Sequence, residues 1–353
     1  MNIKQLSHIK RLSGPVLVTG HTGFKGTWLT LLLERLGIEV IGLSLPPLPT
    51  SLYKRSKRIG KIKEGFFDIR DSSAVHKFIK KNKPSVIIHL AAQPLVLESY
   101  KNPKYTFEVN VIGTSNVLEA AFKTNSTEVV LISTTDKVYE NNNSGKIFSE
   151  SDPLKGKDPY SASKVAAENV IYAWREIRVK NGGPALLTAR AGNIIGGGDL
   201  SKNRLIPDLV RAFNSNSKLV IRNPSSSRPW QHVLDPLSGY LLMIDNAING
   251  DNLEVLNFGP VDKSMKVKEV VKIASKNWVN NSTIVFSQQK NTLEAKSLEI
   301  DSSLARNELN WSPFWNQSEA IIETINWWQE VLNKTLLPEQ RCNFEINKMF
   351  TDM

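Results

Sequence analysis

The stretch VLVTGHTGFKG at residues 16–26 decides the fold of this chain. A short β-branched run leads directly into three glycines, Gly20, Gly23 and Gly26. A helical pattern follows over residues 26–36. In such a strand–turn–helix unit, glycines permit a tight turn and the close approach of a pyrophosphate, which the helix N-terminus also attracts. The stretch therefore predicts a dinucleotide-binding end, with a tight turn that binds nothing as the alternative.

The alternation of strand and helix continues through the N-terminal half of the chain. Strands are predicted at residues 15–19, 39–45, 65–68, 85–90, 128–133 and 185–190, and helices at 26–36, 71–81, 106–124 and 161–179. Residues 86–88 and 129–132 are continuously apolar, as is typical of strands that are buried on both faces. The alternation predicts an α/β fold with a Rossmann-like, doubly wound parallel sheet.

After about residue 190 the pattern becomes mixed. Strands are predicted at residues 218–222, 254–258 and 282–286, and helices at 206–213, 236–246, 267–275 and 318–332. We expect residues 1–190 to form an NAD-binding Rossmann domain. Residues 191–353 are expected to form mainly a smaller α+β substrate domain, with some segments returning to the Rossmann domain.

The composition excludes several classes of protein. The chain has 353 residues, of which 41% are hydrophobic and 22% charged, so it is not a disordered chain. Its apolar runs are far shorter than the ~20 residues of a membrane-spanning helix. The single cysteine, Cys342, excludes a disulfide scaffold and a cysteine-cluster zinc site, and we read it as an inert thiol of the C-terminal tail. No metal is expected.

The net charge of +11 favours an anionic ligand. The lysines are dispersed and do not alternate with aromatic residues, so neither a nucleic acid nor a membrane is the expected partner. The N-terminal sequence MNIKQLSHIKRLSG lacks the apolar core of a signal peptide, and a cytoplasmic location is therefore expected.

Two groups of residues predict catalysis. Tyr160 and Lys164 begin a predicted helix with i,i+4 spacing, which places them on one helix face. A nearby ammonium and a positively charged cofactor ring would favour the phenolate of the tyrosine, which could then accept a proton from an alcohol. Thr135, Asp136 and Lys137 follow the strand predicted at residues 128–133, at the sheet edge where open α/β sheets bind ligands. The extra acid–lysine pair suggests elimination chemistry, although an ion pair in a turn remains the alternative.

Motifs along nearly the whole chain resemble those of the extended short-chain dehydrogenase/reductase family. They are GHTGFKG at 20–26, LAAQPLV at 90–96, TTDKVY at 134–139, DPYSASK at 158–164, RAGNIIGGGD at 190–199, RLIPD at 204–208, RPWQHVLDPLSGY at 228–240 and NFGP at 257–260. Within the family, the Thr–Asp–Lys triplet is similar to that of the NAD-dependent sugar-nucleotide dehydratases that act on CDP-glucose. Leu97 and Leu200 depart from the family, which has arginine and tryptophan there, and both bear on the substrate loop.

The resemblance implies a lyase that converts CDP-D-glucose to CDP-4-keto-6-deoxy-D-glucose, a step of deoxysugar biosynthesis of the kind that supplies lipopolysaccharide O-antigens. Tyr160, helped by Lys164 and Thr135, would take the proton of the 4-hydroxyl while hydride passes from C4 to tightly bound NAD. Asp136 would then protonate the departing C6 hydroxyl, and Lys137 would assist removal of the C5 proton. Hydride would finally return to C6. A homodimer, paired through the helices predicted at 106–124 and 161–179, is also implied.

The resemblance implies the remaining site residues as well. NAD is expected to contact Gly20, Thr22, Gly23, Phe24, Lys25, Gly26, Asp68, Ile69, Leu90, Ala91, Ala92, Gln93 and Asn110, together with Tyr160 and Lys164. The sugar nucleotide is expected to contact Gln93, Asn193, Arg204, Leu205, Arg228, Trp230 and His232. NAD is preferred to NADP because Ser44 stands where the ribose-binding acid is usual and no arginine lies beside it.

Several of these residues have a purely structural alternative. Asp68 fits a turn or helix cap, Asn110 a helix-packing amide, Trp230 a packing ring and His232 a buried structural histidine. For the whole chain, the alternative functions are another enzyme of the extended family, such as a sugar-nucleotide 4-epimerase, and a non-catalytic NAD-binding regulator. An epimerase needs the Tyr–Lys pair but has no use for Asp136 and Lys137 as an elimination pair.

Overall fold

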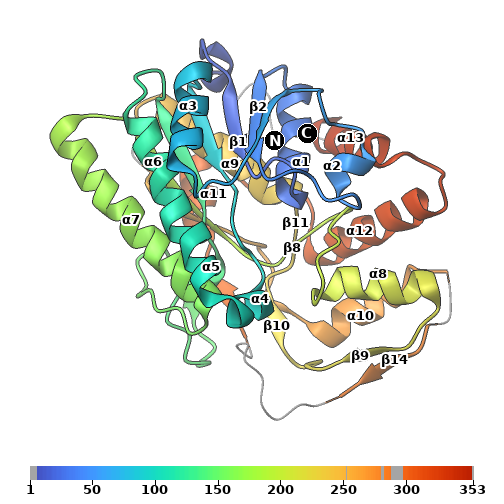
Figure 1. Cartoon of the computed structure of the whole chain (residues 1–353). Coiled ribbons are helices and arrows are strands. Elements are labelled where there is room, and N and C mark those ends of the chain that lie inside the picture. Colours follow the sequence, from blue (N-terminus) through green and yellow to red (C-terminus); the bar gives the residue numbers. More distant parts are fainter. Residues whose placement is uncertain (1–5, 252, 280–281, 288–296, 352–353) are drawn as a thin grey trace.

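The computed structural model describes residues 6–251, 253–279, 282–287 and 297–351, and a seven-stranded parallel sheet lies at its centre (Figure 1). The strand order is β12-β7-β5-β4-β1-β2-β3. The strands are β1 (Val16–Thr19), β2 (Val40–Ser44), β3 (Lys63–Phe66), β4 (Val86–His89), β5 (Val129–Ser133), β7 (Ala185–Ala191) and β12 (Val255–Phe258). The predicted doubly wound parallel sheet is confirmed.

The residues of the central strands β1, β4 and β5 alternate between two hydrophobic cores. In β1, Val16 and Val18 belong to one core and Leu17 to the other. Residues of α1 and α9 pack in the first core, and residues of α3, α6 and α7 pack in the second. Because both faces of the sheet are covered by helices, its central strands are buried throughout and mostly apolar.

The helices have the following bounds: α1 (Phe24–Arg35), α2 (Leu52–Arg55), α3 (Ser72–Asn82), α4 (Val96–Lys101), α5 (Pro103–Phe107), α6 (Gly113–Phe122), α7 (Pro159–Asn181), α8 (Leu205–Ser215), α9 (Leu234–Ile248), α10 (Val267–Lys276), α11 (Ser303–Leu309), α12 (Gln317–Leu332) and α13 (Pro338–Thr351). Two short 3-10 turns, η2 (Ile9–Arg11) and η4 (Asp136–Val138), and a π-helical segment, η3 (Glu108–Ile112), complete the helical elements. No helix of the described residues is long and apolar enough to span a bilayer.

The helix predicted at residues 106–124 differs from the observed structure. The chain enters a helix earlier, at Pro103, passes through the π-helical segment η3 and continues as α6. Asn110 lies inside η3, where its buried amide bonds to groups outside the helix. A π-helical insertion changes which side chains face inward without ending the helix, so a 3.6-residue pattern cannot reveal it.

The strand predicted at residues 254–258 belongs to the central sheet. As β12, it pairs in parallel with β7 at the edge of that sheet, although it comes after the substrate-domain segments in the sequence. β3 begins two residues before the predicted strand, because this second edge strand has polar residues that hide its start. Periodicity finds a strand, but it does not say which sheet the strand joins.

Outside the central sheet, the chain forms small two-stranded sheets: β8 (Ile194–Ile195) with β11 (Gln231–His232), β9 (Leu219–Ile221) with β14 (Ile284–Phe286), β10 (Ser227–Arg228) with β13 (Met265–Lys266), and β6 (Ile147–Phe148) with β15 (Glu299–Ile300). In Figure 1, α8, α10, β9 and β14 lie together below the central sheet. The C-terminal helix α13 packs on α1 and α12 and buries Cys342 completely. The cysteine is therefore a core residue, not the tail thiol expected from its position.

Candidate active site

The glycine turn after β1 is closed too tightly for side chains. Gly20 has φ +73°, and a Cβ there would lie 2.8 Å from the Ala91 nitrogen. A Cβ on Gly26 would lie 2.2 Å from the Gly20 oxygen. Gly23, the N-cap of α1, is exposed and offers no side-chain cap to the first turn. The free amides of this helix start and the bare glycine backbone fit a pyrophosphate, as the dinucleotide prediction requires.

Two hydroxyl groups are hydrogen-bonded to each other at the end of β2. The Ser44 and Thr22 hydroxyl oxygens lie 2.7 Å apart, and Thr22 also donates to the Leu45 carbonyl. Asp68, just after β3, accepts hydrogen bonds from Arg70, and Ile69 is buried. Asp68 thus makes the turn contact that its sequence allowed as an alternative, and its carboxylate remains partly exposed at this edge of the sheet.

The segment after β4, residues 90–93, lies beside the glycine turn. The Thr19 hydroxyl accepts from the amides of Leu90 and Ala91. Asn110 accepts from the Gln93 amide at 2.8 Å and donates to the Gln93 carbonyl and to the Ser163 hydroxyl. Asn110 therefore joins this segment to α7, and its own amide is fully used in doing so.

Tyr160 and Lys164 stand in the first turns of α7. This helix begins with a capping box between Asp158 and Ser161, and Pro159 occupies its first turn. Both Tyr160 and Lys164 are buried, and the Lys164 ammonium donates to the Ser133 carbonyl at 3.2 Å. The i,i+4 pair predicted from the sequence is therefore aimed at the carboxyl end of β5.

Burial controls the acidity of both groups. It raises the pKa of Tyr160 to about 12, although a hydrogen bond with Thr135 and the charge of Arg204 act in the opposite direction. It lowers the pKa of Lys164 to about 8, and the nearby Lys25 lowers it further. From the sequence we expected a neighbouring ammonium to favour the phenolate of Tyr160. In the free chain, desolvation has the larger effect, and it disfavours both the phenolate and the ammonium.

The Thr–Asp–Lys triplet forms a 3-10 turn at the end of β5. Thr135 caps this turn by accepting from the Lys137 amide, and its hydroxyl lies 3.1 Å from Asp136 Oδ1. The Asp136 side chain is completely buried, and Lys137 Nζ lies 3.6 Å from Asp136 Oδ1. The ion pair considered as an alternative is present. Since Thr135 also bonds to Tyr160, one hydroxyl connects the proposed base to the proposed acid.

Lys25 makes contacts that the glycine motif alone did not reveal. Its ammonium donates to the Ser133 hydroxyl and to the Tyr240 hydroxyl, both at 2.9 Å. Burial, together with the charge of Arg204, lowers the pKa of Lys25 to about 7. Two lysines, Lys25 and Lys164, therefore share Ser133, one through its side chain and the other through its carbonyl.

A buried ion pair behind the triplet was missed by the sequence reasoning. Glu168 accepts from the Thr134 hydroxyl at 2.7 Å and from Arg190 Nε at 2.9 Å. Arg190 also donates to the Tyr139 hydroxyl at 3.0 Å. Glu168 lies four residues after Lys164, and its negative charge partly offsets the lowering of the Lys164 pKa by burial. That i+4 spacing was the signal that could have identified it.

Three residues predicted to bind the sugar nucleotide, Arg204, Leu205 and Arg228, lie at the start of α8 and in β10. Arg204, just before α8, pairs with the buried Asp199 at 3.1 Å, and its charge acts on Tyr160. Leu205 begins α8, and Arg228 lies in β10, where it donates to the Ser227 carbonyl. Arg204 is thus close enough to Tyr160 for its charge to lower the pKa of the phenol.

Trp230 and His232 are buried and make contacts within the fold. The Trp230 indole donates to the Met265 carbonyl at 3.2 Å. His232 is completely buried, and its Nε2 lies 3.0 Å from a carboxylate oxygen of Glu345 in α13. Both rings make the structural contacts that the sequence allowed as alternatives, and their contact with the sugar nucleotide stays a prediction.

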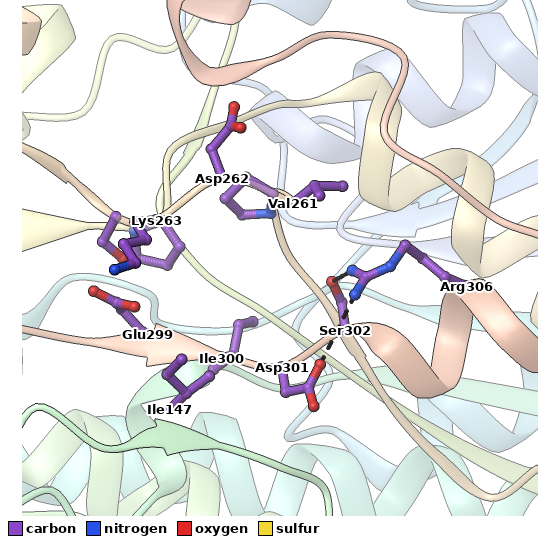
Figure 2. A pocket seen from close by; sticks show the side chains of 12 residues that line it. Ile147, Val261, Asp262, Lys263, Glu299, Ile300, Asp301, Ser302 and Arg306 are labelled. Carbon is purple, nitrogen blue, oxygen red and sulfur yellow. Dashed lines mark hydrogen bonds and ion pairs between the residues drawn. The ribbon is translucent and has the colours of Figure 1, made fainter.

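A separate cavity of about 290 Å³ lies beside the loop at residues 260–264 (Figure 2). Arg306 at its wall donates to the Ser302 hydroxyl at 2.7 Å, and Asp301 accepts from the Ser303 amide at the start of α11. None of the predicted site residues lines it. Its polar groups serve the local fold, and we assign it no ligand. In the described part of the chain, no three His, Cys, Asp or Glu side chains cluster as metal ligands would.

The comparisons with known proteins agree with this geometry. The chain matches the NAD dependent epimerase/dehydratase family over residues 16–259. It is 39% identical to a CDP-glucose 4,6-dehydratase of Salmonella typhimurium, over 88% of this chain and 89% of the relative. It is 25% identical to a UDP-glucose 4-epimerase of Lactobacillus helveticus, over 89% and 97%. The solved dTDP-glucose 4,6-dehydratase of Streptomyces venezuelae has the same fold, with a TM-score of 0.78 at 22% identity, over 91% of this chain and 98% of that one.

Proposed function

Because this chain belongs to the NAD dependent epimerase/dehydratase family, we propose that it catalyses the NAD-dependent 4,6-dehydration of CDP-glucose. The observation that carries the proposal is the contact of Thr135 with both Tyr160 and Asp136. It brings a tyrosine suited to alcohol oxidation and a buried carboxylic acid to the same point of the sheet edge. The product would be CDP-4-keto-6-deoxyglucose, an intermediate for deoxysugars.

NAD fits the glycine turn and the segment after β4. Gly20, Gly23 and Gly26 with the start of α1 would hold its pyrophosphate, and residues 90–93 would lie along it. When bound, NAD supplies a hydride acceptor and donor and a positively charged ring. The substrate would lie between this edge and the part of the chain that contains α8 and β10.

The first half of the reaction needs a base for the 4-hydroxyl of the sugar. Tyr160 would accept that proton, and the Thr135 hydroxyl that bonds to it would stabilise the phenolate. Lys164, held by the Ser133 carbonyl, adds positive charge below the tyrosine when it is protonated. The resulting 4-ketone makes the C5 hydrogen acidic.

The second half needs an acid at the C6 hydroxyl and a base at C5. Asp136 would give its proton to the leaving hydroxyl, and Lys137, the more exposed of the two, would take the C5 proton as a neutral amine. A 4-epimerase would have no use for this pair, so the pair favours dehydration over that alternative.

An endpoint assay by mass spectrometry tests the proposal. The purified protein is incubated with CDP-, dTDP-, UDP- and GDP-glucose, each with and without added NAD. Loss of one water from CDP-glucose alone is the expected result. Loss of water from another nucleotide would keep the chemistry and change the base, and an isomer without mass change would identify an epimerase. Asp136→Asn should abolish water loss in the first case and spare isomerisation in the last.

The same proposal includes a homodimer that forms through α5, α6 and α7. These helices pack side by side along one face of the sheet (Figure 1). Tyr172 on α7, Phe107 on α5 and Ile112 on η3, which joins α5 to α6, are large hydrophobic residues exposed by 63%, 38% and 53%. Exposed apolar side chains gathered on neighbouring helices are typical of a protein interface. A cytoplasmic location is also proposed, because NAD and sugar nucleotides are cytoplasmic metabolites.

A further inference from the structure

The turn that follows β7 lies directly against the carboxylate of Asp136. A Cβ placed on Gly192 would lie 1.8 Å from Asp136 Oδ2 and 2.0 Å from its Cγ. Such distances are far inside van der Waals contact, so any side chain at residue 192 would displace the carboxylate. The need for glycine at residue 192 therefore comes from the neighbouring carboxylate of Asp136. It does not come from the backbone, because the φ of Gly192 is not in the left-handed region.

Asn193 contacts the same carboxylate with its side chain. Its Nδ2 donates to Asp136 Oδ2 at 3.2 Å. The backbone of Asn193 is left-handed, with φ +46°, which asparagine tolerates better than most residues. This conformation turns the chain from β7 into β8 immediately beside the acid.

Gln231 of β11 anchors this turn. Its Nε2 donates to the Gly192 carbonyl at 3.0 Å, and its backbone amide donates to the Asn193 carbonyl at 3.3 Å. Gln231 is fully buried. The contact with Asp136 therefore belongs to a rigid part of the fold, in which a strand distant in sequence fixes both peptide groups of the turn.

We propose that Asn193 is a positioning residue for the general acid, with Gly192 providing the space in which the acid lies. This inference rests on the proposed function. An amide nitrogen can only donate, so Asp136 Oδ2 must accept, and the transferable proton is directed to Oδ1. In the free chain Oδ1 accepts from the Thr135 hydroxyl and lies 3.6 Å from Lys137 Nζ. A hydroxyl can also accept, so once Lys137 is a neutral amine Oδ1 can carry the proton and donate to Thr135. Asn193 thus selects which oxygen of the acid carries the proton.

The elimination step is balanced with the proton on that oxygen. The C5 hydrogen leaves as a proton to the base, and its electron pair forms the C5–C6 double bond. The C6–O bond breaks, and the oxygen departs as water with the proton from Asp136 Oδ1. Asp136 is left as a carboxylate, to which the Asn193 amide still donates. Without Asn193, the acid could hold its proton on Oδ2, turned away from Thr135.

The test separates oxidation from water loss in single turnovers with CDP-glucose. Asn193→Gly retains the left-handed backbone and removes only the amide. It should form reduced nicotinamide at the wild-type rate, seen by near-ultraviolet absorbance, and lose water about 100-fold more slowly, so the reduced cofactor accumulates. Gly192→Ala should do the same. Asp136→Asn serves as the positive control for stalling, and Tyr160→Phe should form no reduced cofactor.

A double variant tests whether the slower water loss comes from the missing contact with Asp136 or from a general disturbance of the fold. In the Asp136→Asn background, Asn193→Gly should cause no further slowing, because its target is already gone. The inference is overturned if Asn193→Gly loses water at the wild-type rate, or if it raises KM with kcat unchanged, which would make Asn193 a substrate contact. If wild-type protein loses no water from CDP-glucose, the proposed function fails and this inference with it. If the wild-type protein and Asn193→Gly both lose water from CDP-glucose at the same rate, the inference fails and the proposed function stands.

Discussion

The buried pair of Glu168 and Arg190 gives the sharpest prediction about the stability of the chain. The residues are 8% and 4% exposed, and the carboxylate accepts from Arg190 Nε at 2.9 and 3.1 Å. Glu168→Leu removes the acceptor and leaves the guanidinium charge buried without the carboxylate to which it is hydrogen-bonded. Loss of one member of a buried ion pair costs about 3–5 kcal/mol, because the remaining charge has lost its water and its counter-ion.

Urea unfolding at neutral pH measures this cost directly. The midpoint should fall while the slope stays unchanged, which reports a loss of stability without a change in the surface exposed on unfolding. The matched control is Glu119→Gln, which breaks the exposed i,i+4 pair with Lys123 and should cost no more than about 1 kcal/mol. The double variant Glu168→Leu/Arg190→Met should recover most of the loss, since neither charge of the pair remains. A cost below about 1 kcal/mol for Glu168→Leu would refute the reasoning.

Three further predictions concern other parts of the chain. Because burial holds the pKa of Lys164 at about 8, below its ordinary 10.5, the unfolded chain binds one more proton between these values; wild type should therefore gain up to about 3 kcal/mol over Lys164→Met as pH rises through this window. A constant difference in urea unfolding would contradict this. Gly26→Ala should abolish NAD binding in a fluorescence titration, whereas Gly37→Ala, which meets no neighbour, should bind normally and lose only about 1 kcal/mol for its left-handed backbone. Tyr172→Glu should give a monomer in light scattering if α7 forms the dimer interface; an unchanged mass would exclude that interface.

Local features of the active site could be predicted from the sequence. The capping box and proline that begin α7, and the i,i+4 placement of Tyr160 and Lys164, depend only on residues close together in the chain. The tight turn between β1 and α1 likewise follows from its glycines. The acidity of Tyr160 could not be predicted in the same way, because the burial that raises its pKa comes from many distant elements.

The sequence by itself determined the elements, the parallel sheet and the types of group at its carboxyl edge, because strand periodicity, glycine turns and helix caps are short-range properties. Only the tertiary structure decided which groups meet there. The β5–β7 neighbourhood brings the turn at Gly192 and Asn193 against Asp136, and α13 brings Glu345 to within 3.0 Å of His232 Nε2. Such contacts join residues tens or hundreds of positions apart, so they depend on strand order and packing, which no local pattern contains.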